Sequence, residues 1–428
     1  MQDVLAMILA GGQGDRLSVL SEQRAKPAVV FGGHYRIIDF ALSNCANSSL
    51  DSVAVLTQYR PRSLVNHIGA GRAWGYDSLH SNLQILQPYL GRADMDWYQG
   101  TADAVYQNLY VIEEAHAREV LILAGDQIYL TNYRNMLGYH RSKRADVTVG
   151  VYSVPIEEAH RFGVLEMDSD GRIVDFEEKP SNPRSTWISM SVYIFNRDVL
   201  VEQLQADADD ETSNRDFGRD ILPRMFETSR VYGYPYHGYW KDVGTVEAYW
   251  QANMDLAGVN PPLRLQDGEA SLWTAGPIRP PARFGSQALV QESIVSAGAE
   301  VHGTAIRSII SPGVLIEPGA EVRDSVVHHG AVVRSGAVVD RCVVDKEVTV
   351  GFDALLGEGD VTIANFERPD IVNTGITIIG KRVTIPRGFR AGRNVVIGPG
   401  VASELDEISH LPSGSSVHPL VMPLHLFV

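Results

Sequence analysis

Short apolar segments recur through the first half of the chain, separated by polar, glycine-containing stretches. Residues 4–10 (VLAMILA), 53–56 (VAVL) and 120–124 (VLILA) are continuous apolar runs, typical of strands buried on both faces of a parallel sheet. Residues 146–154 instead alternate apolar and polar positions, as a half-exposed strand does. These segments predict a sheet in which most strands are parallel.

A helical pattern lies between the second and third apolar runs. Residues 102–115 place Ala102, Val105, Leu109 and Ile112 on one face of a helix. Strands that alternate with helices predict an α/β fold, here a Rossmann-like, mostly parallel sheet with helices on both faces. We assign this domain to residues 1–257 and, because prolines are frequent in residues 258–290, we predict a linker there.

A six-residue period follows the linker. One run of small apolar residues consists of Val314, Ala320, Val326, Val332, Val338, Val344 and Val350, and a second of Ile379, Ile385, Ala391 and Ile397. This period fits a parallel β-helix, whose triangular coil returns the same kind of residue to the same inner corner. We predict such a domain, with a C-terminal tail, for residues 291–428; a valine-rich β-sandwich is the competing interpretation. Coils need stacked neighbours, so this domain also favours oligomer formation.

Charge and cysteine content exclude several classes of protein. The 428 residues carry a formal net charge of −15, which argues against a nucleic-acid-binding surface and against binding to an anionic membrane. Cys45 and Cys342 lie far apart and indicate neither a disulfide framework nor a cysteine-based zinc site. The first apolar run is too short for a signal peptide or a membrane span. We therefore expect a cytoplasmic protein.

The first strand ends in a glycine cluster that suits a phosphate group. Gly11, Gly12 and Gly14 follow directly on residues 4–10, and backbone N–H groups in such a turn can bind anions. The Walker A and dinucleotide patterns are excluded, because Asp15 and Arg16 follow Gly14 in place of the residues they require. Arg16 would supply a planar charge to polyphosphate oxygens. A tight strand-to-helix turn without a ligand is the alternative.

Two carboxylates are candidates for a metal site. Asp126 comes just past the end of the strand 120–124, where open α/β sheets bind their ligands, although a helix N-cap is an equal alternative. Asp242 lies between aromatic residues and Gly244, and is by itself an ordinary turn aspartate. Two carboxylates together with water and phosphate oxygens form a common Mg²⁺ site.

Two lysines and an aromatic pair complete the candidate residues. Lys26 and Lys179 each precede a proline, which restricts the backbone to extended conformations and predicts that each is presented from a stiff loop. Solvated surface lysines are the alternative. Trp97 and Tyr98 precede a glycine turn and a helix, and either line a pocket for a base or sugar or anchor the core.

Several stretches together resemble one family, the sugar-1-phosphate nucleotidylyltransferases, and within it the glucose-1-phosphate adenylyltransferase branch. LAGGQGDRL resembles the signature loop, and the supporting strings are RAKPAVVFGGHYRIIDFALSNC, WYQGTADAV, LILAGDQIY, FGVLEMDSDGRIVDFEEKP and YWKDVGTVEAYW. The resemblance covers nearly the whole chain. It implies an N-terminal nucleotidyltransferase domain and a C-terminal left-handed parallel β-helix.

The implied reaction joins ATP and α-glucose 1-phosphate to give ADP-glucose and pyrophosphate, for glycogen synthesis. The resemblance implies that the nucleotide is bound by Gly11, Gly12, Gly14, Arg16, Gly100 and Thr101. Arg16 and Lys26 would hold the departing phosphates. Asp126 and Asp242 would hold Mg²⁺, which makes these four the catalytic residues.

The resemblance also implies a binding site for the sugar phosphate. Lys179 would hold the phosphate and Glu178 the sugar hydroxyls, with Tyr98, Gly163 and Ser189 at further positions. A cytoplasmic, allosterically regulated homotetramer is implied as well. Its partners would be ATP and glucose 1-phosphate, with no nucleic acid and no membrane.

Three departures from the family pattern bear on these expectations. Asp15 stands where the family usually has threonine, so we expect its side chain to point outward. Gln23 replaces a lysine that contacts the activator in some members, and the sequence does not identify an effector. Ser191 stands where glycine is usual. None of these removes a group that the reaction needs.

Three alternatives belong to other activities or classes. The first is a nucleotidylyltransferase for another nucleotide and sugar 1-phosphate, since one fold supports several such pairs. The second is a regulatory subunit of low activity, which the presence of all four catalytic residues disfavours. The third is an acyltransferase that uses a histidine of the β-helix, but we expect His302, His328 and His329 to be surface residues.

Overall fold

The computed structural model describes residues 3–78, 81–88, 97–265 and 270–419. The chain forms two compact units, each built from separate stretches of sequence. Unit 1 comprises Met1–Gly12, Ile38–Trp240 and Gln266–Ala275, and unit 2 comprises Gln13–Ile37, Lys241–Leu265 and Gly276–Val428. The domain limits proposed above follow the order of the sequence and remain a prediction. Among the helices of the described ranges, none has the length and apolar character needed to cross a membrane.

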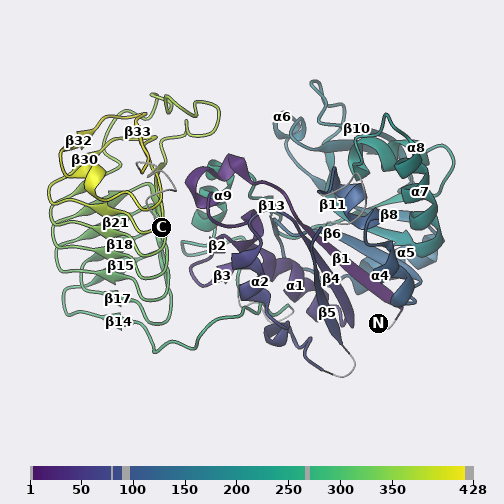
Figure 1. The fold of residues 1–428 in the computed structure, drawn as a ribbon, viewed down its shortest axis with the longest axis horizontal. Helices are drawn as coiled ribbons and strands as arrows, with labels where there is room; N and C mark the ends of the chain where they lie inside the picture. Colours follow the sequence, from purple (N-terminus) through teal and green to yellow (C-terminus); the bar gives the residue numbers. More distant parts are fainter. Residues whose placement is uncertain (1–2, 79–80, 89–96, 266–269, 420–428) are drawn as a thin grey trace, which may run out of the picture. The chain divides into compact units, whose positions relative to one another are not determined.

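Unit 1 contains a mixed sheet of nine strands in the order β10-β9-β11-β6-β1-β4-β5, with β8 paired to β11 and β12 (Figure 1). Four strands are parallel: β1 (Val4–Ala10), β4 (Ser52–Thr57), β5 (Asn82–Leu86) and β6 (Glu119–Ala124). β11 (Trp187–Asn196) runs antiparallel to β6 and to β8 (Val147–Ser153), while β12 (Val231–Pro235) is parallel to β8. β9 (Gly163–Met167) and β10 (Ile173–Glu178) are antiparallel. The predicted mostly parallel α/β sheet is confirmed.

The helices of this part of the chain contain between 4 and 13 residues. They are α1 (Ile37–Asn47), α2 (Arg62–Ile68), α3 (Thr101–Tyr106), α4 (Leu109–Glu114), α5 (Arg134–Lys143), α6 (Ile156–Ala159), α7 (Arg197–Asp209) and α8 (Leu222–Met225). The single helix expected over residues 102–115 is therefore two helices. Asn108 separates them, because its amide donates to the carbonyl of Ala104 and to the hydroxyl of Tyr98.

Strand β8 departs from its expected exposure. Residues 147–151 are all buried, although the alternating sequence predicted a half-exposed strand. The polar Thr148 is tolerated inside, because its hydroxyl lies 2.8 Å from Nδ1 of His140. An alternating pattern fails here because a buried partner satisfies the polar residue.

Most of unit 2 is a parallel β-helix whose strands form three sheets (Figure 1). The first sheet contains β14 (Arg283–Phe284), β17 (Glu300–Val301), β20 (Leu315–Ile316), β23 (Val332–Val333), β26 (Thr349–Val350) and β29 (Thr384–Ile385). The second contains β15 (Leu289–Gln291), β18 (Thr304–Ile306), β21 (Glu321–Arg323), β24 (Val338–Asp340), β27 (Leu355–Leu356), β30 (Arg390–Ala391) and β32 (His410–Leu411). The third contains β16 (Ile294–Val295), β19 (Ile309–Ile310), β22 (Val326–Val327), β25 (Cys342–Val344), β28 (Thr377–Ile379), β31 (Val396–Ile397) and β33 (Ser416–Val417). The left-handed parallel β-helix predicted for this region is confirmed.

The period of the coils differs from a strict six. Val333 pairs with Val350, and Val327 with Val344, so these coils contain 17 residues each. One side of each coil is therefore a residue shorter than the other two. Val332 and Val338, expected inside, are only half-buried, and their neighbours Val333 and Val339 enter the core instead. The second run is confirmed, because its four members are all buried in the core.

Two further segments belong to unit 2. Residues 13–37 contain two 3-10 helices, Asp15–Leu20 and Lys26–Ala28, and the antiparallel pair β2 (Val30–Phe31) and β3 (Tyr35–Arg36). Residues 241–265 contain β13 (Lys241–Asp242) and α9 (Val246–Met254), which begins at the N-cap Thr245. The third 3-10 helix of unit 2, Ser403–Leu405, lies between β31 and β32 in the sequence.

Candidate active site

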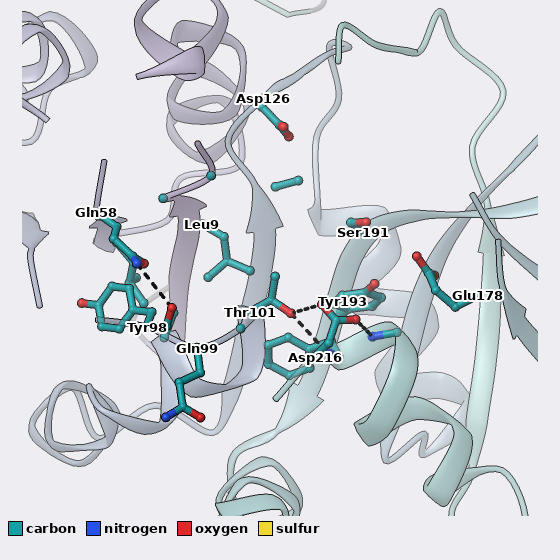
Figure 2. Close-up of a pocket in the computed structure, with 18 of the residues that line it drawn as sticks. Leu9, Gln58, Tyr98, Gln99, Thr101, Asp126, Glu178, Ser191, Tyr193 and Asp216 are labelled. Carbon is teal, nitrogen blue, oxygen red and sulfur yellow. Dashed lines mark hydrogen bonds between the residues drawn. The ribbon is translucent and has the colours of Figure 1, made fainter. Parts of the chain in front are cut away.

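Unit 1 contains a pocket of about 510 Å³ at the carboxyl ends of β1 and β6 (Figure 2). Gly11 and Gly12 line it after β1, and Asp126 lines it after β6. Both strands are parallel neighbours, so their ends meet at one edge of the sheet, where open α/β folds bind ligands. A side chain on Gly12 would meet no atom within 4 Å, which leaves backbone facing open space. Gly11 and Gly12 of the predicted glycine loop therefore share one pocket with Asp126.

Tyr98 forms part of the same wall. Its ring is buried, and its hydroxyl accepts a hydrogen bond from Asn108 at 3.1 Å. Its carbonyl accepts one from Gln58 at 3.3 Å (Figure 2). Burial raises the pKa of the Tyr98 hydroxyl, so it stays protonated at neutral pH. Trp97 is half exposed and stacks on Tyr59, which also lines the pocket. Tyr98 thus belongs to the core, whereas Trp97 lies at the surface.

Gly100 is required by close packing. A Cβ there would lie 2.2 Å from the carbonyl oxygen of Arg215, a contact that no side chain can make. Next to it, Thr101 begins α3 and donates its hydroxyl to Asp216 at 2.9 Å, while accepting from the backbone N–H of Phe217 at 3.1 Å. These contacts fix Asp216 in the pocket wall, where its other oxygen accepts from the N–H of Gly218 (Figure 2).

Glu178 and Lys179 line the pocket at the end of β10. The Lys179 ammonium lies 3.0 Å from Oε1 of Glu178. Two glycines leave room for that carboxylate: a Cβ on Gly163 would lie 2.8 Å from Oε2 of Glu178, and one on Gly218 would lie 3.0 Å from it. Gly163 itself does not line the pocket among the described residues.

The expected extended backbone at the two lysines that precede proline is wrong. Lys179 has φ +51°, in the left-handed region, and its N–H is held by the carbonyl of Phe162 at 3.0 Å. Lys26 begins a 3-10 helix instead of an extended loop. In both cases backbone hydrogen bonds, to Phe162 for Lys179 and from Val29 for Lys26, outweigh the steric preference imposed by the following proline.

Ser189 was expected in the sugar-phosphate site, but Ser191 lines the pocket in its place. Ser189 is buried and donates to the hydroxyl of Tyr193 at 3.3 Å, whereas Ser191 and Tyr193 line the pocket. The pairing of β11 with β8 is irregular between Ser189 and Tyr193, and Ser191 has φ +52°. That conformation favours glycine, which explains physically why glycine suits this position.

The remaining predicted residues lie in unit 2. Gly14 has φ +74°, and a Cβ on it would lie 3.1 Å from Cβ of Lys26. Lys26 is buried, and its ammonium lies 3.2 Å from Oδ1 of Asp242. A Cβ on Gly244 would lie 3.2 Å from the Arg16 guanidinium and 3.0 Å from Oδ2 of Asp242, so both groups border this glycine. Asp15 is exposed, as expected.

The predicted residues therefore form two groups. Unit 1 brings Gly11, Gly12, Tyr98, Gly100, Thr101, Asp126, Glu178 and Lys179 to one pocket. Unit 2 brings Arg16, Lys26 and Asp242 around Gly244. Within the ranges that the structure describes, three or more His, Cys, Asp or Glu side chains nowhere gather as a metal site.

Sequence reasoning missed Gln58, Ser191, Tyr193, Asp216 and Gly218. The pattern Asp216-Phe217-Gly218 carried one usable signal, since an aspartate before a helical turn is a common N-cap. It caps the short π-helical turn Phe217–Ile221 through the N–H groups of Gly218 and Arg219. The expectation that His328 is a surface residue is wrong, because it is fully buried.

Comparison with known proteins gives concordant results. Residues 5–258 match the nucleotidyl transferase family, and residues 280–379 match the GlmU-like C-terminal hexapeptide family. The glucose-1-phosphate adenylyltransferase of Thermomicrobium roseum is 53% identical over 98% of this chain and 99% of its own length. Those of Acetivibrio thermocellus and Thermotoga maritima are 42% and 45% identical, each over 97% of this chain, and over 98% and 99% of their own lengths. The chain belongs to the glucose-1-phosphate adenylyltransferase family of nucleotidyltransferases.

Proposed function

We propose that the protein transfers the adenylyl group of ATP to α-D-glucose 1-phosphate, giving ADP-glucose and pyrophosphate. An oxygen of the sugar phosphate attacks the α-phosphorus of ATP, and the bond to the β-phosphate oxygen breaks. Such chemistry depends on positioning and on neutralising charge. The observation that carries the proposal is the unit 1 pocket, which joins a glycine-rich strand end and Asp126 to the Glu178–Lys179 pair.

The glycine loop and the basic residues of unit 2 bind ATP in this proposal. Gly11 and Gly12 expose backbone without obstructing side chains, which suits close approach of a nucleotide. Gly14, Gly100 and Thr101 complete the proposed nucleotide-binding set. Arg16 and Lys26 hold the β- and γ-phosphates, and their charges stabilise pyrophosphate as it leaves.

Glu178 and Lys179 bind the sugar phosphate in this proposal. The side chain of Lys179 is half exposed, and its ammonium can exchange part of its contact with Glu178 for a phosphate oxygen. Glu178 then accepts from sugar hydroxyls. Tyr98, Gly163 and Ser189 shape the surroundings, and the pocket position of Asp216 makes its carboxylate a further acceptor for a sugar hydroxyl.

The carboxylates of Asp126 and Asp242 suit Mg²⁺. Both side chains are partly exposed, and both supply oxygen, the donor that hard divalent cations take. Two carboxylates leave the remaining positions to water and substrate phosphate, which is how Mg²⁺ is commonly held. When bound, the ion would neutralise charge that develops on the α-phosphate. The ammonium of Lys26, 3.2 Å from Asp242, would add a positive charge to that of the ion.

The cellular setting follows from the chemistry of the product. ADP-glucose is an activated glucosyl donor, so we propose that the enzyme supplies glycogen synthesis in the cytoplasm. The ends of a stack of coils must be capped or used in contacts, which suits assembly, and we propose a homotetramer under allosteric control. ATP and glucose 1-phosphate are the proposed partners; the net charge of −15 disfavours nucleic acid and anionic membranes.

Pyrophosphate release by the purified protein tests the function. The assay contains Mg²⁺ and glucose 1-phosphate, and compares ATP, UTP, dTTP, CTP and GTP. Strong preference for ATP supports the proposal. Turnover with another nucleotide would keep the mechanism and replace the substrate. No turnover with any nucleotide, with or without added sugar phosphates, would favour a regulatory subunit.

A further inference from the structure

Unit 2 contains a buried chain of polar side chains formed by Arg24, Asp345, His328 and Tyr249, here called the Asp345 network. Asp345, His328 and Tyr249 are completely buried, and Arg24 is 4% exposed. The network joins three segments that are distant in sequence: residues 13–37, helix α9 and the β-helix. None of these four residues has a role in the reaction proposed above.

The contacts of the network run in an unbroken series. Arg24 forms a two-pronged ion pair with Asp345, one prong of which joins Nη1 and Oδ1 at 3.0 Å. Nδ1 of His328 lies 2.9 Å from the same Oδ1, and Nε2 of His328 lies 2.8 Å from the Tyr249 hydroxyl. That hydroxyl donates to the carbonyl of Val30 at 2.5 Å.

The series contains more acceptors than donors around His328. Since Tyr249 donates its single proton to Val30, its oxygen can only accept from His328, and Asp345 can only accept as well. A fully bonded series thus needs a proton on each ring nitrogen of His328. Burial opposes that charge by lowering the pKa of His328, while Arg24 holds the pKa of Asp345 below its usual value.

Both ends of the network adjoin the proposed phosphate-binding residues. Arg24 is two residues before Lys26, and Val30 is four residues after it. On the other side, Tyr249 is the fourth residue of α9, whose N-cap Thr245 directly follows Gly244 and lies three residues after Asp242. The Lys26–Asp242 contact of 3.2 Å therefore joins two segments that the network also joins.

A second contact fixes α9 to the same coils. The indole N–H of Trp250 donates to the carbonyl of Asp324 at 2.8 Å, and the Arg341 guanidinium lies 4.3 Å from the Trp250 ring centre. Helix α9 is thus held on the β-helix by two adjacent residues. The segment carrying Lys26 is tied to α9 and the β-helix through Arg24 and Val30 of the network, and through the N–H of Gly32, which donates to Asn253 at 3.0 Å.

Stability alone is a poor explanation for such a network. Burying charges costs several kcal/mol for each ion, and apolar replacements of buried ion pairs are often as stable or more stable. A bonded polar network does, however, permit one arrangement of its members where apolar packing permits several. The network therefore fixes the orientation of the segments that it joins.

We propose that Asp345 is a positioning residue for adenylyl transfer, which acts through Arg24, His328 and Tyr249 to hold Lys26 beside Asp242. The inference rests on the proposed function. It assigns to the β-helix a part in setting the geometry of the phosphate-binding groups, although Asp345 itself touches no substrate.

Steady-state kinetics of the full-length chain test this proposal with Asp345→Asn and the milder Tyr249→Phe, which keeps the ring and removes only the hydroxyl. Thr377→Val is the matched control, because it removes one buried hydroxyl that donates to the carbonyl of Gly392 elsewhere in the β-helix. We expect kcat/KM for ATP to fall about tenfold in the first two, the order of effect expected when one or two hydrogen bonds no longer hold Lys26 in place. The KM for glucose 1-phosphate should change less than about twofold, because Glu178 and Lys179 lie in unit 1.

A background substitution separates positioning from a general loss of stability. With Lys26→Ala already present, Tyr249→Phe should reduce kcat/KM for ATP no further, since the group that it positions is absent. Equal losses with and without Lys26, or losses equal to those of Thr377→Val, would overturn the proposal. If the wild-type protein is active and Tyr249→Phe has the same kinetics, this inference is overturned and the proposed function stands. Inactive wild-type protein would overturn the proposed function, and this inference with it.

Discussion

The ammonium of Lys179 lies 3.0 Å from the carboxylate of Glu178, its neighbour in the chain. Adjacent residues of a regular strand point to opposite faces, so this contact depends on the turn that the backbone makes at Lys179, where φ is +51°. The conformation places both charges in the pocket of unit 1. A phosphate and a hydroxyl group of one ligand can then be bound by adjacent residues.

Lys179→Ala should raise the KM for glucose 1-phosphate by about 10- to 100-fold, the range expected when one charged hydrogen bond is lost. The KM for ATP should change little. Steady-state kinetics with each substrate varied in turn measure both constants. Lys143→Ala is the control, because Lys143 also pairs with a carboxylate, Asp170, but lies on another surface. Equal KM values for Lys179→Ala and wild type would remove Lys179 from the sugar-phosphate site.

Asp126→Ala should abolish turnover with little loss of stability. The carboxylate is partly exposed at a strand end and its removal leaves no large cavity, whereas loss of charge neutralisation at the α-phosphate costs at least about 100-fold in kcat. Pyrophosphate release and a thermal melt measure the two effects. Asp198→Ala, which removes an exposed carboxylate paired with Arg197, should change neither. Near-normal kcat in Asp126→Ala with Mg²⁺ present would refute the assignment.

Gly218→Ala should raise the KM for glucose 1-phosphate several-fold without preventing folding. The new Cβ would lie 3.0 Å from Oε2 of Glu178, so the carboxylate must move by a few tenths of an ångström. Gly138→Ala is the control, because a Cβ there meets nothing within 4 Å and the exposed site lies inside α5. That control should stabilise the protein by about 0.5–1 kcal/mol. In a Glu178→Ala background, the effect of Gly218→Ala on KM should vanish; if it persists, Gly218 acts by another route.

Lys346→Met should stabilise the protein more at pH 7 than at pH 10. Burial, and then the charges of Arg36 and Arg24, lower the pKa of Lys346 to about 7, whereas in the unfolded chain it is about 10.4. Between these values the unfolded state binds more protons, so this group makes stability rise with pH and reduces it at pH 7 and below. Methionine keeps the length of the side chain and removes this contribution.

Urea unfolding of wild type and Lys346→Met at the two pH values measures the difference. Lys143→Met, in unit 1, removes an ammonium that pairs with Asp170; it serves as the control and should show no gain at pH 7. A gain for Lys346→Met that is the same at pH 7 and pH 10 would mean that packing, and not titration, is responsible.

Local patterns predicted the elements that depend on local physics. The buried strands β1, β4 and β6 follow from continuous apolar runs, and the β-helix follows from small apolar residues that recur about every six positions. The strand ends placed Gly11, Gly12 and Asp126 at one edge of the sheet. Details failed where a distant partner intervened: His140 allowed Thr148 to be buried, and Asn108 divided one expected helix into two.

The sequence alone determined the order of the elements, the family, and most of the residues proposed to meet ATP and the sugar phosphate, because apolar periodicity and glycine-rich turns are properties of short stretches. Tertiary structure decided which of those residues share a pocket. Asp216 stands beside Thr101 across more than a hundred residues, and Arg24 meets Asp345 across more than three hundred. Such contacts form between segments that only folding brings together, so no local pattern records them.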